Sequence, residues 1–292
     1  NLCSGELPEP CAGDAVVCLM PESLAEAEEL LDENPGASLL SGTTDIVPDM
    51  KNGRFETKKI LDLSRVEELR GIARSGDAIR IGSCATNGDL LRSELIKEYL
   101  PALWEASSRS GAPAVQNRAT IGGNLATASG AADLPSILLP LDASVSVESV
   151  GGTREMKLEK FIRGYRDPDL APNEIMKEVI VPLPKPGSVQ KFYKRGSRKA
   201  LTLSRVSLGF YAEVESGVVW EFRAGAGSMS PTPVRLRKLE AAVKEKKLTQ
   251  ELISEAVETV RGEVNPRKSP EWRKAMTANL TRRFLEGLLE EK

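Results

Sequence analysis

The sequence predicts an α+β protein that consists of two domains. Through about residue 184, segments typical of strands alternate with segments typical of helices, whereas beyond residue 188 several strands are followed by several helices. The stretch "PLPKPGS", residues 182–188, lies between these regions and holds three prolines and one glycine, which is typical of a domain boundary. We therefore expect an N-terminal extension over residues 1–14, a first domain over residues 15–184 and a C-terminal domain over residues 188–292.

The first domain is expected to open with a helix. Residues 1–14 are rich in Gly, Pro, Glu and Cys, so they predict irregular structure. In "SLAEAEELLDE", which follows Pro21, Ser23 and Glu26 form the Ser-x-x-Glu pattern of a capping box. Leu24 and Ala27 begin an apolar stripe at helical spacing, which indicates one buried face.

Local patterns predict the other elements of the first domain. "GASLL" predicts a short buried strand, "DIVPDMKNG" a short helix closed by its glycine, and "KKILDLS" a strand. Ser64 and Glu67 repeat the capping-box pattern, so a helix is expected at "SRVEEL". "GIARSGDAIRIGS" predicts a hairpin that turns near Gly76 and Asp77. Residues 87–110 are expected to be mainly helical, with an interruption near Pro101, and residues 133–141 to form another helix, while "ASVSVES" and "EIMKEVIVP" predict strands.

The C-terminal domain is expected to combine an antiparallel sheet with helices. The segments "QKFYKRGS", "SRVSLGFYAEVESG" and "VVWEFRAGAGS" are typical of extended chain, and the last two predict a hairpin through Ser216 and Gly217. Helices are expected at about residues 235–246, 249–262 and 271–290.

Composition excludes several classes of function. Hydrophobic residues make up 40% and charged residues 28% of the chain, and no apolar run is long enough to cross a bilayer. The N-terminus lacks the pattern of a signal peptide, so we expect a cytoplasmic protein. A net charge of −2 argues against a nucleic-acid binder that relies on a basic surface. The chain has no histidine, which excludes Ser-His-Asp catalysis, His-ligated metals and a flavin attached through His.

The cysteines do not indicate a metal site. Cys3, Cys11 and Cys18 lie near the N-terminus with a spacing that fits no zinc or iron–sulfur pattern, and Cys84 stands alone. Free thiols are the expected state of a cytosolic chain.

Two glycine-containing segments are candidate phosphate-binding turns. Each follows an apolar stretch and precedes an expected helix. Glycines let backbone N–H groups approach a pyrophosphate, and the N-terminus of a helix adds a favourable dipole. Either segment could instead serve only to reverse the chain, and no G-x-G-x-x-G follows a strand, so a Rossmann site is not indicated. The candidate residues are Leu39, Leu40, Ser41, Gly42, Thr43, Thr44 and Asp45 in "LLSGTTD", and Thr120, Ile121, Gly122, Gly123 and Asn124 in "TIGGN".

Asp133 has two possible roles. It precedes Leu134 and Pro135 at the start of an expected helix, where an aspartate is a good N-cap. Alternatively, its carboxylate accepts hydrogen bonds from a ligand.

Five segments together resemble the FAD-binding subunit of the molybdenum hydroxylases, the family of the xanthine dehydrogenases and the carbon monoxide, nicotinate and hydroxybenzoyl-CoA enzymes. Their order and spacing agree from about residue 15 to the end, and the bacterial purine-hydroxylase type is the most similar. The resemblance implies a two-subdomain PCMH-type FAD-binding fold, followed by a C-terminal CO dehydrogenase flavoprotein-like domain of antiparallel strands packed with helices. The segments are "LLSGTTDIVPDMKNG", "IRIGSCATNGDL", "QNRATIGGNLATASGAADLPSILLPLDASV", "KFYKRGSRKALTLSRVSLG" and "RAGAGSMSPTPVR".

The resemblance also implies roles for single residues in the two segments. In the family, the first segment reads Ala-Gly-Gly-Thr-Asp and binds the FAD pyrophosphate, but this chain has Thr43 at the second glycine. A Cβ there could crowd a phosphate oxygen or force a different turn if the position needs a positive φ. The second segment matches the family in full, and Asn124 is expected to add a side-chain hydrogen bond. Upstream of it, the family often has Arg-Asn where this chain has Gln116 and Asn117.

Four further residues match family positions around the flavin. Ser129 and Asp133 match polar residues near the ribityl chain and the pyrophosphate, Lys194 matches a lysine near the flavin, and Ile175 matches an apolar flavin neighbour. The charge of Lys194 would then favour an anionic reduced flavin.

The resemblance implies an electron-transfer subunit in a complex. One partner subunit would carry two [2Fe-2S] clusters and another a molybdopterin cofactor, and electrons would pass through FAD to NAD or another acceptor. Two alternatives stay open. Thr43 and Gln116 are compatible with a structural subunit that has lost FAD. A separate flavin reductase of the enolpyruvyl reductase type would need its own catalytic Ser and Glu, which the sequence does not place.

Overall fold

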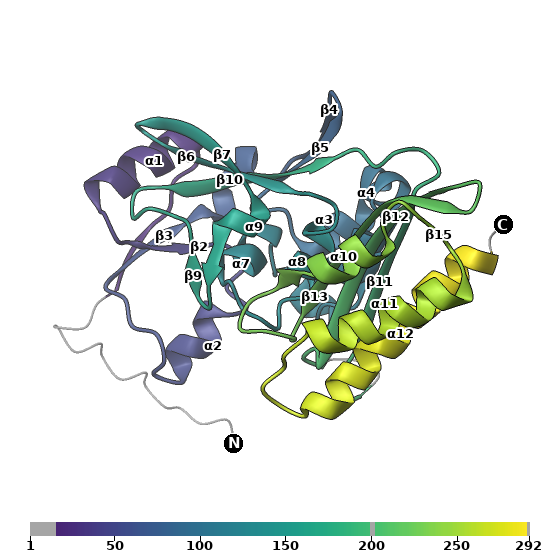
Figure 1. Cartoon of the computed structure of the whole chain (residues 1–292). Coiled ribbons are helices and arrows are strands. Elements are labelled where there is room, and N and C mark those ends of the chain that lie inside the picture. The colour runs from purple at the N-terminus through teal and green to yellow at the C-terminus, as the bar shows by residue number, and fades with distance from the viewer. Residues whose placement is uncertain (1–15, 199–201, 291–292) are drawn as a thin grey trace, which may run out of the picture.

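A computed structural model describes residues 16–198 and 202–290. The expected extension over residues 1–14, with Cys3 and Cys11, lies outside the described residues. The chain forms a small N-terminal subdomain, a central subdomain and a C-terminal sheet covered by long helices (Figure 1). Within the described ranges, no helix is long and apolar enough to cross a bilayer.

The N-terminal subdomain is a three-stranded parallel sheet in the order β1-β3-β2, with its own small core. Its elements are β1 (Val17–Leu19), α1 (Leu24–Glu33), β2 (Ser38–Leu40), α2 (Ile46–Lys51) and β3 (Lys59–Asp62). The expected cap of α1 is present, because the Ser23 hydroxyl accepts the Glu26 N–H at 3.2 Å.

The helix expected at "SRVEEL" is wrong. The segment forms two 3₁₀ turns, Leu63–Arg65 and Glu67–Leu69. The first turn is capped by Asp62, whose carboxylate accepts the Ser64 N–H at 2.9 Å, so Ser64 lies inside the turn rather than at its cap. Leu63, Val66 and Leu69 are buried in the N-terminal core, and this three-residue spacing favours 3₁₀ geometry.

The central subdomain is built on a five-stranded antiparallel sheet in the order β4-β5-β10-β6-β7. Of its helices, α4, α7 and α9 contact this sheet. The hairpin expected near Gly76 and Asp77 is confirmed. Strand β7 and the small β8-β9 hairpin were not expected from the sequence. The elements are β4 (Ile72–Ser75), β5 (Ala78–Gly82), α3 (Asn87–Arg92), α4 (Glu94–Tyr99), α5 (Pro101–Ser108), α6 (Pro113–Gln116), α7 (Ile121–Ala126), α8 (Leu134–Leu138), β6 (Ser144–Ser149), β7 (Gly152–Lys157), α9 (Leu158–Phe161), β8 (Ile162–Gly164), β9 (Asp167–Pro168) and β10 (Ile175–Pro182).

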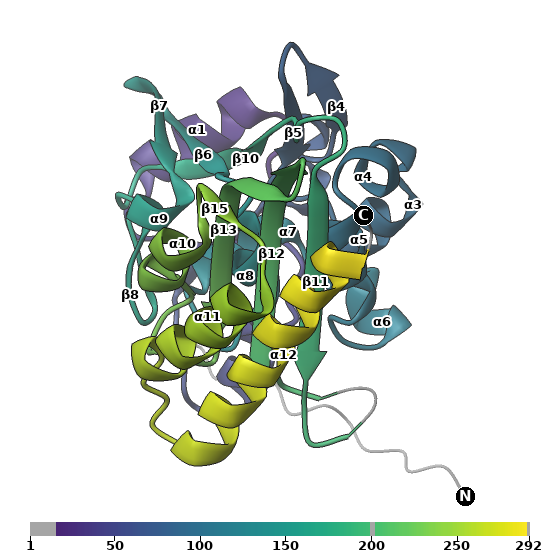
Figure 2. The ribbon, with the colours of Figure 1, turned by 45° about the vertical axis from the view of Figure 1, so that its right-hand side comes forward.

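The C-terminal domain is an antiparallel sheet between two layers of helices (Figure 2). Helices α10–α12 pack on one face, and α5 and α8 of the central subdomain pack on the other. The expected hairpin is confirmed, and Ser216 and Gly217 both have positive φ, at 51° and 77°. The elements are β11 (Val189–Arg195), β12 (Val206–Glu215), β13 (Val218–Gly227), β14 (Val234–Arg235), α10 (Arg237–Val243), β15 (Lys246–Lys247), α11 (Gln250–Glu263) and α12 (Pro270–Glu290).

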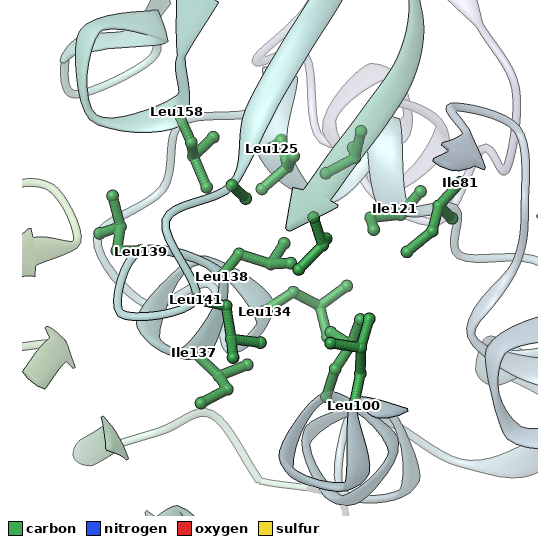
Figure 3. Packing of buried hydrophobic residues seen from close by; sticks show 14 of the residues in the cluster. Ile81, Leu100, Ile121, Leu125, Leu134, Ile137, Leu138, Leu139, Leu141 and Leu158 are labelled. Carbon is green, nitrogen blue, oxygen red and sulfur yellow. The ribbon is translucent and has the colours of Figure 1, made fainter. Parts of the chain in front are cut away.

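The largest core holds the two helices that matter for the site. Ile121 and Leu125 from α7, and Leu134 and Ile137 from α8, are all fully buried in one cluster (Figure 3). Because these side chains share one close-packed core, the N-terminal ends of α7 and α8 are fixed relative to each other.

Candidate cofactor-binding site

The structure places the first glycine segment against the residues that lead into the second. A Cβ added to Gly42 would lie 2.1 Å from the Arg118 carbonyl oxygen and 3.2 Å from the Cα of Ala119. Arg118 and Ala119 lead directly into Thr120 and the second segment. Gly42 is therefore required by close backbone approach, and the contact joins the N-terminal subdomain to the central one.

The first segment is an open turn between β2 and α2. Leu40 ends β2, and Asp45 precedes α2 without a side-chain capping bond. Among the described residues, no acceptor lies within hydrogen-bond distance of the N–H groups of Gly42, Thr43, Thr44 or Asp45, and the two threonine hydroxyls make no hydrogen bond. Several free donors in one turn are the arrangement that binds an anion such as a phosphate.

Thr43 stands where the family pattern has a glycine, and its backbone lies in the left-handed region. Its φ is +65°, in a region that a β-branched residue rarely adopts. This chain therefore keeps a turn that suits glycine and places a threonine in it.

The second segment is the start of helix α7 rather than a turn before it. Thr120 is the N-cap, and its hydroxyl accepts the Gly123 N–H at 3.1 Å. The N–H groups of Ile121 and Gly122 donate to the carbonyl oxygens of Ala85 and Ser83, at 2.9 and 2.8 Å. These donors already have acceptors within the protein, so this segment offers a ligand its shape more than its N–H groups.

The two adjacent glycines have different structural roles. A Cβ on Gly122 would lie 2.7 Å from both the Cβ and the carbonyl oxygen of Ser83, so that glycine is needed for internal packing. A Cβ on Gly123 would approach only the Thr120 hydroxyl, at 3.0 Å, and Gly123 is exposed. Gly123 is therefore the glycine that leaves a surface open to a ligand.

Asn124 supplies a hydrogen-bond acceptor that the described protein does not use. Its side-chain oxygen is buried and has no partner. A buried polar atom without a partner costs about 1–3 kcal/mol, so a hydroxyl or amide of a ligand is the expected donor. Ser129 is half-buried and accepts the Ala131 N–H at 3.3 Å.

Asp133 and Lys194 form a buried ion pair at the junction of the two domains. The Lys194 ammonium lies 2.5 Å from the Asp133 carboxylate, and their side chains are 7% and 9% exposed. The carboxylate also accepts the Ser204 hydroxyl at 2.5 Å and the Ser110 hydroxyl at 3.4 Å. Lys194 further donates to the Arg109 carbonyl oxygen at 2.9 Å.

This network corrects two expectations. Asp133 does not cap α8 with its side chain, because the carboxylate is turned towards Lys194 and Ser204. Lys194 is already paired with a carboxylate, so its charge is largely compensated before any ligand binds. Sequence reasoning missed Ser204 and Ser110, which hold the carboxylate, since no local pattern links residues so far apart in the chain.

Helix α8 carries Asp133 to this position because two glycines let it approach the C-terminal sheet. Cβ atoms on Gly209 and Gly225 would lie 2.3 and 2.4 Å from the Ser136 carbonyl oxygen. Close approach of α8 to β12 and β13 brings Asp133 within reach of Lys194 on β11.

Three other residues near the site are buried or hydrogen-bonded within the protein. Ile175 is fully buried in the N-terminal core, so in this structure it presents no exposed surface to a ligand. Gln116 donates to the carbonyl oxygens of Ser108 and Gly111, which ties α6 to the end of α5. Cys84 lies beneath the first segment, where it accepts the Ser41 hydroxyl at 3.2 Å, and burial raises the pKa of its thiol.

The free donors, the open glycine and the orphaned amide oxygen are the groups that an extended ligand with a phosphate group and hydroxyls would need. The residues present therefore fit a dinucleotide cofactor. Among the described residues, no group of His, Cys, Asp or Glu could hold a metal ion.

Comparison with known proteins gives the family. Residues 14–184 match the family "FAD binding domain in molybdopterin dehydrogenase", and residues 191–288 match the CO dehydrogenase flavoprotein C-terminal domain. The nicotinate dehydrogenase FAD-subunit of Eubacterium barkeri is 30% identical over 93% of this chain and 95% of its own. The xanthine dehydrogenase FAD-binding subunit of Escherichia coli O157:H7 is 31% identical over 86% of each chain.

Solved structures agree with these relatives. A chain of carbon monoxide dehydrogenase from Hydrogenophaga pseudoflava superimposes with a TM-score of 0.88 at 28% identity, over 92% of this chain and 95% of that one. The fold and site thus define a flavoprotein subunit of the oxidoreductases. The chain belongs to the FAD-binding subunits of the molybdenum hydroxylase family, as the resemblance implied.

Proposed function

We propose that this chain is the electron-transfer flavoprotein subunit of a multi-subunit molybdenum hydroxylase. Electrons would arrive from [2Fe-2S] clusters on one partner subunit, after oxidation of a substrate at a molybdopterin cofactor on another. FAD would accept them and deliver them to NAD or another acceptor, in a cytoplasmic complex. The observation that carries the proposal is the contact between Gly42 and Arg118, which joins the segment with the free N–H groups to the residues that lead into the second segment.

The residues of this chain would bind and orient the cofactor. The N–H groups of Gly42–Asp45 and the Thr43 and Thr44 hydroxyls would hold the diphosphate, with the Asn124 side-chain oxygen accepting from a cofactor hydroxyl or amide. The isoalloxazine supplies the redox chemistry once bound. The Asp133–Lys194 pair would give the site a fixed and nearly neutral polar support, since each charge is compensated by the other.

Ser129, Ile175 and Lys194 complete the proposed set. The half-buried Ser129 would contact the cofactor near its ribityl chain. Ile175 would contribute only through movement of the N-terminal core, because it is fully buried. Lys194 would act through its hydrogen bonds to Asp133 and Arg109 rather than as a free cation.

Native purification tests the proposal directly. We expect a yellow protein with the absorption bands of bound flavin, which releases FAD on denaturation. Two further chains should co-purify, one with iron and sulfide and one with molybdenum. A colourless complex of the same chains would instead favour a structural subunit that has lost FAD, and a monomeric yellow protein with its own reductase activity would favour the separate flavin reductase.

A further inference from the structure

A pocket on the central subdomain is lined by none of the residues proposed to hold FAD. Its volume is about 380 Å³, which lies within the range of small-molecule sites. In Figure 2, α3 and α4 lie just below the β4-β5 hairpin, and the pocket is formed where these elements meet. The lining residues are Arg70, Ile72, Asp89, Arg92 and Ser93.

The guanidinium of Arg70 has unused hydrogen-bonding capacity. Its Nη2 donates to the Ser64 carbonyl oxygen at 2.5 Å, whereas its Nε is buried without a hydrogen-bond partner among the described residues. Its ion pair with Glu67 is long, at 3.9 Å from Nε, and that carboxylate is 85% exposed, so the pair compensates little of the charge. Most of the positive charge of Arg70 is therefore left for an added anion.

The guanidinium of Arg92 faces a carboxylate that is already in use. Asp89 caps α3 with one oxygen, which accepts the Thr86 N–H at 2.8 Å and the Thr86 hydroxyl at 2.6 Å. Its other oxygen accepts from the Nη2 of Arg92 at 2.7 Å. A Cβ on Gly88 would lie 3.1 Å from the Nη1 of Arg92, so this glycine leaves the room in which the guanidinium lies. The pocket thus holds two positive groups and one negative group, and its net charge is positive.

The remaining lining residues add a hydrogen-bond donor and an apolar surface. The Ser93 hydroxyl accepts the Ile96 N–H at 3.4 Å, and its own proton has no acceptor in the part of the chain that the structure describes. Ile72 is half-buried and packs against the central core. A ligand that satisfies these groups carries a negative charge and several acceptor oxygens, together with a short apolar part.

We propose that this pocket binds a small organic anion, whose carboxylate or phosphate group lies between Arg70 and Arg92 and whose carbon chain packs on Ile72. A planar guanidinium donates two parallel hydrogen bonds to such a group, and the bonds are strengthened by charge. The site is separate from the one that the proposed function requires, since it is lined by other residues and is occupied by another ligand.

The test measures ligand binding to the natively purified protein by calorimetry, with inorganic phosphate and propyl phosphate as separate probes. We expect propyl phosphate to bind more tightly, because its carbon chain covers Ile72. Arg92→Gln and Arg70→Gln should each weaken both probes about tenfold or more, as loss of a charge-assisted bond should. Ile72→Ala should remove only the advantage of propyl phosphate.

A matched control for Arg92→Gln is Arg261→Gln on α11. Arg261 is also exposed and pairs with a carboxylate three residues earlier, that of Glu258 at 3.6 Å, but it lines no part of the pocket. Its affinities for both probes should equal those of the wild type. The side chain of Arg92 is 66% exposed, so Arg92→Gln should fold normally even if Arg70→Gln does not.

The proposal is overturned if neither probe binds the wild type, or if Arg92→Gln binds both as tightly as the wild type does. Equal losses in Arg92→Gln and Arg261→Gln would also overturn it, because the probes would then respond to surface charge alone. FAD content of the same samples separates this proposal from the proposed function. A wild-type protein without FAD would reject the proposed function, whereas the comparison of the two arginine variants would still decide the pocket.

Discussion

Thr43 is held in a backbone conformation that costs free energy, with a φ of +65°. For an L-residue this region costs about 1–2 kcal/mol, and glycine escapes that cost at some loss of entropy. We expect Thr43→Gly to stabilise the apo-protein by up to about 1 kcal/mol in denaturant unfolding. The hydroxyl makes no hydrogen bond in the described structure, so we expect it to donate to a phosphate oxygen, and FAD affinity to fall about tenfold.

A matched control for Thr43 is Ser216→Gly. Ser216 also has a positive φ, at 51°, but lies in the hairpin between β12 and β13. It should gain stability without any change in FAD affinity. Equal or tighter FAD binding by Thr43→Gly would show that the hydroxyl does not contact the cofactor.

At Gly123, an added side chain would occupy the open surface beside Thr120. Because its Cβ would approach only the Thr120 hydroxyl, Gly123→Val should leave the fold intact, since valine is no worse than glycine in a helix. FAD content, measured by absorbance after purification, should fall to near zero. Gly262→Val in α11 is the control, since nothing lies within 4 Å of a Cβ there. Normal flavin content in Gly123→Val would exclude a cofactor contact at this glycine.

Replacement of Asp133 tests the buried ion pair. Asp133→Asn leaves the Lys194 charge buried without a carboxylate, and removal of one partner of such a pair typically costs 3–5 kcal/mol. We expect a loss of about 3 kcal/mol in the unfolding free energy of the apo-protein. The double variant Asp133→Asn, Lys194→Met should recover most of it, because no orphan charge remains. If the single variant is as stable as the wild type, the pair contributes nothing to the fold.

These residues also show which features of the site could be predicted from the sequence. The glycines and the polar residues of the two segments were predictable, because short motifs carry the requirement for close backbone approach. The pairing of Asp133 with Lys194 was not, since it depends on how α8 packs on a sheet that comes later in the chain. The use of the α7 N–H groups by Ser83 and Ala85 likewise depends on tertiary contacts.

At the scale of elements, too, features set by local sequence were predictable and features set by tertiary contacts were not. The β12-β13 hairpin follows from Ser216 and Gly217, which permit the positive φ values that the turn needs. The expected helix at Ser64 is wrong because the Asp62 cap and the burial of Leu63, Val66 and Leu69 select 3₁₀ turns. Strand β7 has an almost wholly exposed surface, so its sequence carries no apolar alternation that predicts a strand.

Helix α8 is the element whose position the site depends on most. A Cβ on Gly209 would lie 2.3 Å from the Ser136 carbonyl oxygen and 2.6 Å from the Cα of Ile137, so Gly209→Ala must displace α8. Overpacking of this kind costs about 1–3 kcal/mol, and the shift should also separate Asp133 from Lys194 and weaken FAD binding. Gly262→Ala, at an open helical position, should be neutral or stabilising, with normal FAD affinity. Unchanged thermal unfolding of Gly209→Ala would contradict the close packing.

At the scale of the whole molecule, the site lies where three parts of the chain meet, and an ion pair joins two of these parts. Arg166, in the turn between β8 and β9, lies 2.7 Å from Asp49 on α2. Its N–H donates to the Ala128 carbonyl oxygen just beyond α7. The pair therefore joins α2, which follows the first glycine segment, to the loop at Ala128, which follows the second. We expect the pair to slow the separation of α2 from that loop.

Asp49→Asn should accordingly release FAD a few-fold faster than the wild type, measured by dilution of the holoprotein and recovery of flavin fluorescence. The charge-swapped double variant Asp49→Arg, Arg166→Asp should restore slow release if the attraction between the groups is the cause. The hydrogen bond from Arg166 is the main reason that the pKa of Asp49 is lowered. The contact therefore persists as pH falls through the ordinary carboxyl range, and it weakens only when pH falls through that lowered pKa. The difference between wild type and Asp49→Asn should thus be constant from about pH 5 to pH 8 and shrink at high salt. A release rate that the swap does not restore would mean that Asp49 acts through α2 and its contact with Arg54 rather than through its ion pair with Arg166.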